Sequence, residues 1–213
     1  MGQFVFALAL FGPGTLHFWQ GWVFTAVNLA VAITFCAYFY RRDPQLLERR
    51  LLRKEKSGTQ KIIIALVRII YLLICVLCGL DNRFGWSGAY LTKVPPWLTL
   101  LALLLYAGCY FLFIPVMTTN RFAASIIQIE AGQTVADTGP YRLVRHPMYA
   151  VSLVLFCSLP LALGSFIALP FATLLVPILI WRLLAEEKLL QRDLPGYAEY
   201  CHRTPCRLIP FVW

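Results

Sequence analysis

The chain contains few charged residues, and acidic residues are the scarcer kind. Only 14% of its 213 residues are charged and 60% are hydrophobic, whereas soluble domains average about 25% charged and roughly 45–50% apolar residues. An apolar surplus of this size must face a solvent other than water, and the lipid bilayer is that solvent. The composition therefore excludes an ordinary soluble domain and favours an integral membrane protein.

The sequence also lacks the patterns of a disulfide framework or a metal centre. Its seven cysteines are an odd number, and five of them lie inside apolar runs, where thiols behave as small hydrophobic groups. Cys75 and Cys78 form a C-x-x-C pair without the second pair that a zinc site needs. The spacing of Cys201, His202 and Cys206 matches no standard zinc pattern. We therefore expect no bound metal.

The formal net charge of +9 does not indicate a nucleic-acid-binding protein. Lys and Arg stand in blocks between apolar runs, and aromatic residues are not interleaved with them as base stacking requires. Such blocks are typical of cytoplasmic loops of membrane proteins, where anionic headgroups attract them. We expect the lipid bilayer, and not a nucleic acid, to be the partner of this chain. No feature of the sequence indicates an oligomeric state.

Five apolar runs predict membrane-spanning helices. An earlier run at residues 4–11 is too short to cross a hydrocarbon core of about 30 Å. The last two spans are separated only by residues around Gly164, which predicts a tight helical hairpin. The spans are expected at about 19–40, 62–80, 97–117, 147–163 and 165–181. We predict an all-α polytopic membrane protein with about five transmembrane helices.

The distribution of Lys and Arg predicts the orientation of these helices. The 41–61, 118–146 and 182–213 segments contain eight, three and five Lys or Arg residues, whereas the 81–96 loop contains two. Because basic loops remain in the cytoplasm, we expect the three basic segments there. We divide the chain into N-terminal membrane helices, 1–117, and a C-terminal region, 118–213, with a hairpin and a water-facing tail. No internal repeat is visible, which argues against a transporter.

Two polar clusters flank the hairpin, at residues 139–149 and 182–187. Because the hairpin enters the membrane and returns, we expect the two clusters to meet at its mouth. Arg182 and Glu186 are four residues apart and share one helix face. Ionisable side chains near the membrane cost free energy unless they are paired with an opposite charge, so unpaired ones usually have a functional role. An Arg182–Glu186 pair and a helix-capping His146 would also explain them as interface anchors.

The order of these clusters resembles the isoprenylcysteine carboxyl methyltransferase family and its bacterial relatives. The shared elements are Gly-Pro-Tyr-x-x-x-Arg-His-Pro-x-Tyr at 139–149, the apolar hairpin, and Arg-x-x-x-Glu-Glu at 182–187. The tail continues the resemblance with Tyr197-Ala198-Glu199-Tyr200, Arg203, Pro205 and Leu208-Ile209-Pro210. The resemblance covers roughly residues 120–210, and phospholipid N-methyltransferases share the signature more loosely. Val151 departs from it, because the family often has Gly there.

The resemblance implies an S-adenosylmethionine-dependent methyltransferase in a bacterial inner membrane, with its active site in the cytoplasm. It implies catalytic roles for Arg182, which would face a substrate carboxylate, and for Arg145. The 133–136 stretch falls where the loop of the family closes over the cofactor. The cofactor-binding residues that the resemblance implies are Gln128, Thr134, Val135, Tyr141, His146, Pro147, Met148, Tyr149, Glu186 and Glu187.

The sequence allows more than one class of methyl acceptor. A lipidic or hydrophobic carboxylate is the expected acceptor, and it needs no general base because it is already a nucleophile. An amine or thiol would need one, with His146 or Glu187 as candidates. The alternatives are a phospholipid or small-amine N-methyltransferase, a nicotinamide-dependent membrane reductase, and a non-enzymatic membrane scaffold.

Overall fold

The computed structural model describes residues 16–52, 58–120, 122 and 132–213. These residues form helices and loops, and none of them is in a strand. The helices are α2 (Trp19–Arg42), α3 (Pro44–Leu52), α4 (Gly58–Phe84), α5 (Trp86–Tyr90), α6 (Pro96–Thr119), the 3₁₀ helix η1 (Gly139–Arg142), α7 (Pro147–Ala162), α8 (Leu169–Thr173), α9 (Leu175–Asp193) and α10 (Tyr197–Arg203).

Among the described residues, four helices are long and apolar enough to cross a membrane, at Trp19–Arg42, Gly58–Phe84, Pro96–Thr119 and Leu169–Asp193. A fifth apolar helix, α7, is shorter. These helices confirm the predicted all-α polytopic membrane fold. The apolar run of residues 4–11 and Gln128 lie outside the described residues.

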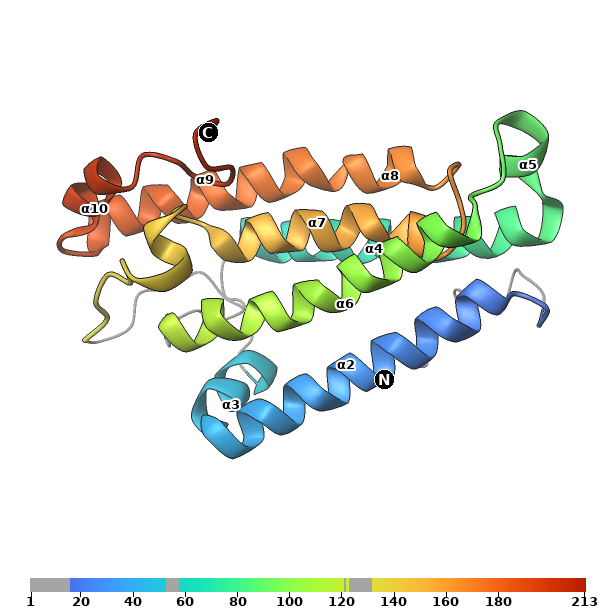
Figure 1. The fold of residues 1–213 in the computed structure, drawn as a ribbon. Coiled ribbons are helices and arrows are strands. Elements are labelled where there is room, and N and C mark those ends of the chain that lie inside the picture. The colour runs from blue at the N-terminus through green and yellow to red at the C-terminus, as the bar shows by residue number, and fades with distance from the viewer. Residues whose placement is uncertain (1–15, 53–57, 121, 123–131) are drawn as a thin grey trace.

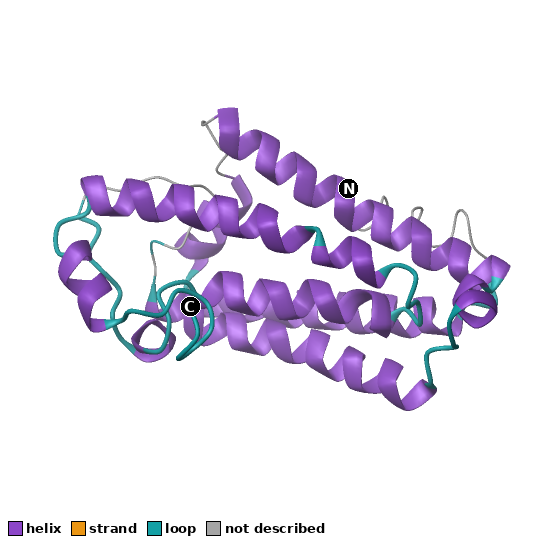
Figure 2. Cartoon of the chain, turned by 90° about the horizontal axis from the view of Figure 1, so that it is seen from above, coloured by secondary structure: helices purple, strands orange, loops and turns teal. Residues whose placement is uncertain are grey.

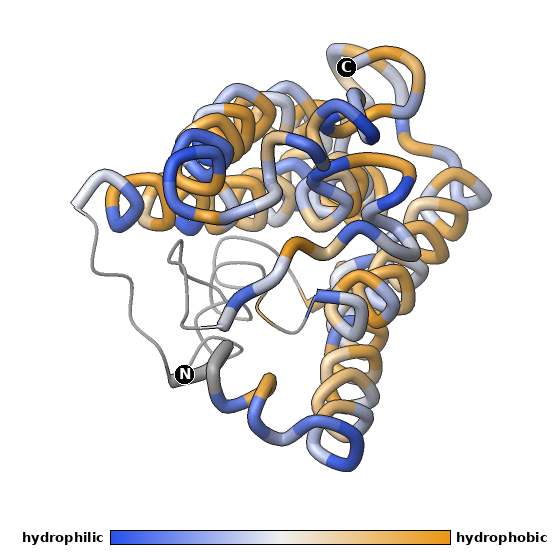
Figure 3. Tube along the Cα trace, turned by 90° about the vertical axis from the view of Figure 1, so that its left-hand side faces the viewer, coloured by the Kyte–Doolittle hydropathy of each residue, from blue (hydrophilic) through white to orange (hydrophobic). Residues whose placement is uncertain are grey.

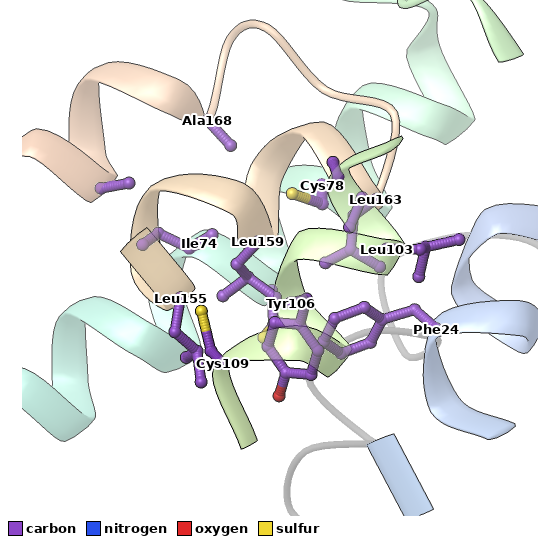
Figure 4. Packing of buried hydrophobic residues seen from close by; sticks show 14 of the residues in the cluster. Phe24, Ile74, Cys78, Leu103, Tyr106, Cys109, Leu155, Leu159, Leu163 and Ala168 are labelled. Atoms are coloured by element: carbon purple, nitrogen blue, oxygen red, sulfur yellow. The ribbon is translucent and has the colours of Figure 1, made fainter. Parts of the chain in front are cut away.

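The helices form an antiparallel bundle in which successive long helices run in opposite directions (Figures 1 and 2). α6 packs along α7 on one side and against α2 on the other, while α4 packs against α7, α8 and α9. Phe24, Tyr106 and Leu159 are among the large side chains of the main buried cluster (Figure 4). The Phe24 and Tyr106 rings lie 4.7 Å apart, which joins α2 to α6.

The predicted hairpin is formed by α7 on one arm and by α8 and α9 on the other. Gly164 has a φ of +73° at the turn, a conformation that glycine adopts without steric cost. Buried Asp81, at the end of α4, accepts hydrogen bonds from the hydroxyls of Ser87 and Ser165. This contact ties the turn to α4 and α5 at the end of the bundle away from the basic segments.

The second arm is longer than the predicted span of 165–181, because α9 continues to Asp193. The buried residues Leu175, Leu179, Leu183 and Glu187 recur every four positions, which is the spacing of one helix face. The same face therefore packs against the bundle both before and after the first charged residue of α9. Polar segments gather at the end of the bundle where α9 finishes (Figure 3).

Candidate functional site

A pocket lies at the end of the bundle where α7 begins and α9 leaves its apolar stretch. It is partly open to solvent, and about 70 Å³ within it is accessible to the centre of a water molecule. Its lining comes from the end of α6, the 133–136 segment, η1, the start of α7, the second half of α9, and α10. The lining residues are Asn120, Phe122, Gln133, Thr134, Val135, Ala136, Tyr141, Arg145, His146, Pro147, Met148, Tyr149, Arg182, Glu186, Leu189, Leu190, Leu194, Tyr197 and Tyr200.

The hydroxyl of Tyr149 joins the two polar clusters inside this pocket. It donates a hydrogen bond of 2.6 Å to Glu186 Oε2 and accepts one of 3.1 Å from Arg182 Nε. Arg182 and Glu186, which share one face of α9, thus both contact the phenol of Tyr149 on α7. The sequence had predicted that these two residues share a helix face. The hairpin brings together residues that are 33 and 37 positions apart.

Glu187 follows Glu186 in the chain but points to different partners. Its Oε1 accepts a hydrogen bond of 2.7 Å from Arg145 Nε, and its Oε2 accepts one of 2.8 Å from Arg207 Nε. Glu187 and Arg145 are both buried. Burial by itself lowers the pKa of Arg145, but the hydrogen bond and charge of Glu187 raise it by more, so the guanidinium stays charged.

Residues 204–207 are not on the pocket lining, but they are held in place by two residues that are, Arg145 and His146. The backbone N–H groups of Arg145 and His146 donate to the carbonyls of Cys206 and Arg207, each at 2.9 Å. Arg145 Nη1 also donates to the carbonyls of Thr204 and Pro205, at 2.9 and 2.8 Å. Arg145 therefore acts as a clamp between α9 and this segment, although part of its surface lines the pocket.

His146 occupies the N-cap position of α7, but its side chain makes no capping hydrogen bond. Its Nε2 and the Tyr197 hydroxyl are buried, and within the described part of the chain neither has a hydrogen-bond partner. Nε2 lies 3.4 Å from Glu187 Oε1, which is long for a hydrogen bond. Because buried polar atoms are normally satisfied, these two atoms are exceptions beside the pocket.

The two tyrosines of α10 complete the pocket. The Tyr200 hydroxyl donates a 2.7 Å hydrogen bond to the carbonyl of Tyr141, which fixes α10 against η1. Burial raises the pKa of both the Tyr197 and Tyr200 phenols, so they remain protonated donors across the physiological range. The sequence showed this Tyr-x-x-Tyr pair only as part of a resemblance.

The structure gathers most of the predicted site residues into this one pocket. The predicted residues on its lining are Thr134, Val135, Tyr141, Arg145, His146, Pro147, Met148, Tyr149, Arg182 and Glu186. Glu187 lies behind the lining and not on it, and Gln128 lies outside the described residues.

Sequence reasoning did not select several lining residues of α9 and α10. Leu189 and Leu190 lie three and four positions after Glu186, so helical spacing places them on the same face. This spacing was a signal that could have found them. Asn120 and Phe122 carry no comparable signal in the sequence, because they reach the pocket through the loop that follows α6.

Part of the chain is similar to a known protein family. Residues 97–195 match the family model of phospholipid methyltransferases. The matched segment is just under half of the chain. It begins in α6 and includes η1, α7, α8 and α9, so it contains both arms of the hairpin and most of the pocket lining. The resemblance to membrane methyltransferases that the motifs predicted is confirmed. Together with the apolar helices, this match supports a membrane methyltransferase.

Two curated proteins are similar to the chain. The cobalt-zinc-cadmium resistance protein CzcN of Cupriavidus metallidurans is 31% identical over 145 residues, which cover 65% of this chain and 59% of that protein. The nickel-cobalt-cadmium resistance protein NccN of Alcaligenes xylosoxydans xylosoxydans is 36% identical over 76 residues, or 33% of this chain and 34% of that protein. The matched segments thus span less than two thirds of either relative.

Proposed function

We propose that the chain is an S-adenosylmethionine-dependent membrane methyltransferase that acts on a lipidic or hydrophobic acceptor. The observation that carries the proposal is the pocket itself. Tyr149, Arg182 and Glu186 meet there, beside polar atoms of His146 and Tyr197 that make no hydrogen bond within the described residues. All but Tyr197 lie in the segment that matches phospholipid methyltransferases. The pocket lies where apolar helices end, so a water-soluble cofactor and a membrane-dissolved acceptor can both reach it.

The residues of the pocket fit the cofactor by their chemistry. When bound, S-adenosylmethionine would supply a methyl group on a sulfonium: a nucleophile attacks the methyl carbon in line with the carbon–sulfur bond, and the sulfur leaves as a thioether. Glu186 offers a carboxylate to the donors of the cofactor, and His146 Nε2 and the Tyr197 hydroxyl offer polar atoms that need partners. Tyr141 and Tyr149 offer aromatic faces to a cationic group. The protein then acts by aligning the reactants and excluding water.

Arg182 is the residue that we assign to the acceptor. It lies on the same helix face as Glu186, one turn closer to the apolar part of α9, where a hydrophobic molecule would arrive from the bilayer. Its guanidinium can orient a carboxylate through charge-assisted hydrogen bonds. A carboxylate acceptor needs no base, so this assignment accounts for the site without a proton-transfer step.

A phospholipid or small-amine acceptor is the second candidate, and two observations favour it. The matching family model is that of phospholipid methyltransferases, and His146 Nε2 is a buried atom in the pocket that can accept a proton. The names of the two relatives refer to metal resistance and identify no methyl acceptor. The acceptor class therefore rests on the chemistry and position of the pocket.

Cofactor binding tests the site. We expect the purified protein to bind S-adenosylmethionine or S-adenosylhomocysteine in calorimetry. His146→Ala and Glu186→Ala should each weaken binding about tenfold or more, since a hydrogen bond to a charged group contributes about 1.5–3 kcal/mol. His202→Ala and Glu199→Ala are matched controls on exposed positions of α10, and should leave affinity unchanged. Unchanged affinity in both site variants would refute the assignment, and tight binding of NADPH instead would favour a reductase.

The acceptor is identified by methyl transfer into lipid. Protein in detergent is supplied with isotopically labelled S-adenosylmethionine and a bacterial membrane lipid extract, and the labelled product is identified by mass spectrometry. A methyl ester would support the carboxylate acceptor, whereas a methylated headgroup amine would support the second candidate. Label in neither class, from protein that binds the cofactor, would contradict a lipid acceptor.

A further inference from the structure

Residues 208–213 form a tight loop, and three of its apolar side chains point outward. Ile209, Phe211 and Val212 are 55%, 101% and 75% exposed. Phe211 has a φ of +64°, a left-handed conformation that costs a bulky residue free energy and persists only when the surroundings impose it. Large apolar side chains gathered on an exposed surface mark a contact with something other than water.

The loop lies beside the middle of α9 and not beyond its end (Figure 1). Leu208 is buried in a cluster with Leu179 and Leu183, and Arg207 is hydrogen-bonded to Glu187. The loop is therefore level with the place where the apolar start of α9 gives way to its first charged residue. This is the level at which a spanning helix crosses from hydrocarbon to headgroups.

We propose that the 208–213 loop is immersed in the bilayer at this boundary, next to α9. The exposed side chains of Trp181 and Leu184 on α9 are 47% and 44% accessible at the same level, so the loop extends a surface that a spanning helix already presents to lipid. Trp213 packs against the Arg207 guanidinium at 5.1 Å. Aromatic rings beside a basic group are the side chains that the interfacial region favours. The sequence had instead predicted a water-facing tail.

Immersion of this loop would connect the membrane surface to Arg145 and His146, which line the pocket. Arg207 immediately precedes the loop and shares the Glu187 carboxylate with Arg145. The carbonyl of Arg207 also accepts the His146 N–H. The loop, Glu187 and the start of α7 are thus one hydrogen-bonded unit, so a loop held by lipid sets the depth of the pocket relative to the bilayer. This inference goes beyond the proposed function and does not depend on it.

Photocrosslinking in liposomes tests the immersion. The photoreactive residue benzoylphenylalanine replaces Phe211 or, in a second variant that guards against misfolding, Val212. The matched positions are Leu104, exposed on the spanning helix α6, and Glu199, exposed on α10. The liposomes contain phosphatidylethanolamine and phosphatidylglycerol, and mass spectrometry counts the lipid adducts after illumination.

We expect lipid adducts at positions 211 and 212 to approach the yield at Leu104 and to exceed the yield at Glu199 by about tenfold, because interfacial aromatic residues contact lipid continuously. Yields as low as at Glu199 would overturn the proposal, since the loop would then face water. Crosslinks mainly to a second copy of the chain would overturn it as well. No methyl transfer enters the readout, so the result is independent of the proposed function.

Discussion

Glu186 and Glu187 are neighbours in the chain, yet the fold gives them different surroundings. Successive residues on a helix point about 100° apart, so one carboxylate can reach the pocket while the next faces the bundle. Glu186 contacts the Tyr149 phenol on the lining, whereas Glu187 is buried between Arg145 and Arg207. We infer that Glu187 positions the Arg145 side chain, which lines the pocket, and does not touch the cofactor.

A substitution of Glu187 should therefore destabilise the protein even without cofactor. Glu187→Ala leaves the buried Arg145 guanidinium without its carboxylate, which costs about 3 kcal/mol or more, and we expect a lower Tm in detergent. Glu187→Gln, which keeps one acceptor oxygen, should lose less. Glu199→Ala is the exposed control, and its stability should stay within about 0.5 kcal/mol of the parent. An unchanged Tm for Glu187→Ala would show that the carboxylate has no positioning role.

At the scale of elements, the α7–α9 hairpin is fastened at both ends. The pocket end is joined by Tyr149, Arg182 and Glu186, and the turn end by Asp81 with Ser87 and Ser165. The Asp81 carboxylate also accepts the Ser87 N–H at 2.7 Å. Since these polar groups are buried, each depends on the others for hydrogen bonds.

The turn should therefore contribute stability but not cofactor affinity. Asp81→Ala leaves the donors of Ser87 and Ser165 unsatisfied, at a cost of about 2 kcal/mol, measured as a shift of thermal unfolding in detergent. A double-mutant cycle with Ser165→Ala should give a coupling energy of about 1 kcal/mol. The exposed Thr173→Ala, which loses only a bond within its own helix, is the control. If the effects of the two substitutions were additive, the hydrogen bond between Asp81 and Ser165 would not contribute to stability.

For the whole molecule, the basic segments and the pocket share one end of the bundle. The described residues that follow α2, α6 and α9 lie at that end, and residues 85–95, which include α5, lie at the other (Figure 1). Membrane insertion retains Lys- and Arg-rich segments in the cytoplasm, so we expect the pocket to open there. This location would give it access to a cofactor made in the cytoplasm.

Protease sites inserted into the intact chain test this orientation. A site between Tyr90 and Leu91, which are both exposed, should be cleaved when protease is added outside spheroplasts. A site appended after Trp213 should be cleaved only in inside-out vesicles. The parent chain without inserted sites is the control for background cleavage. The reverse pattern would place the pocket on the external face, contrary to the charge distribution.

The amino-acid sequence was sufficient to predict the fold class of this protein and the segments that form the pocket. Hydrophobic runs, basic blocks and turn residues are local properties, so they predicted an all-α membrane protein and a hairpin at Gly164. The motif at 139–149 and the acids at 186 and 187 pointed to one end of that hairpin. The order of these residues along the chain carried enough information to predict that they meet.

The packing of the helices determines which of these residues line the pocket and which lie behind it. It placed Glu187 behind the pocket, added Asn120 and Phe122 to the lining, and brought residues 208–213 back beside α9. Each outcome depends on contacts between residues far apart in the chain, such as Arg207 with Glu187 and Asp81 with Ser165. A local pattern shows which side chains need partners, but only the packing of distant segments shows which partners they obtain.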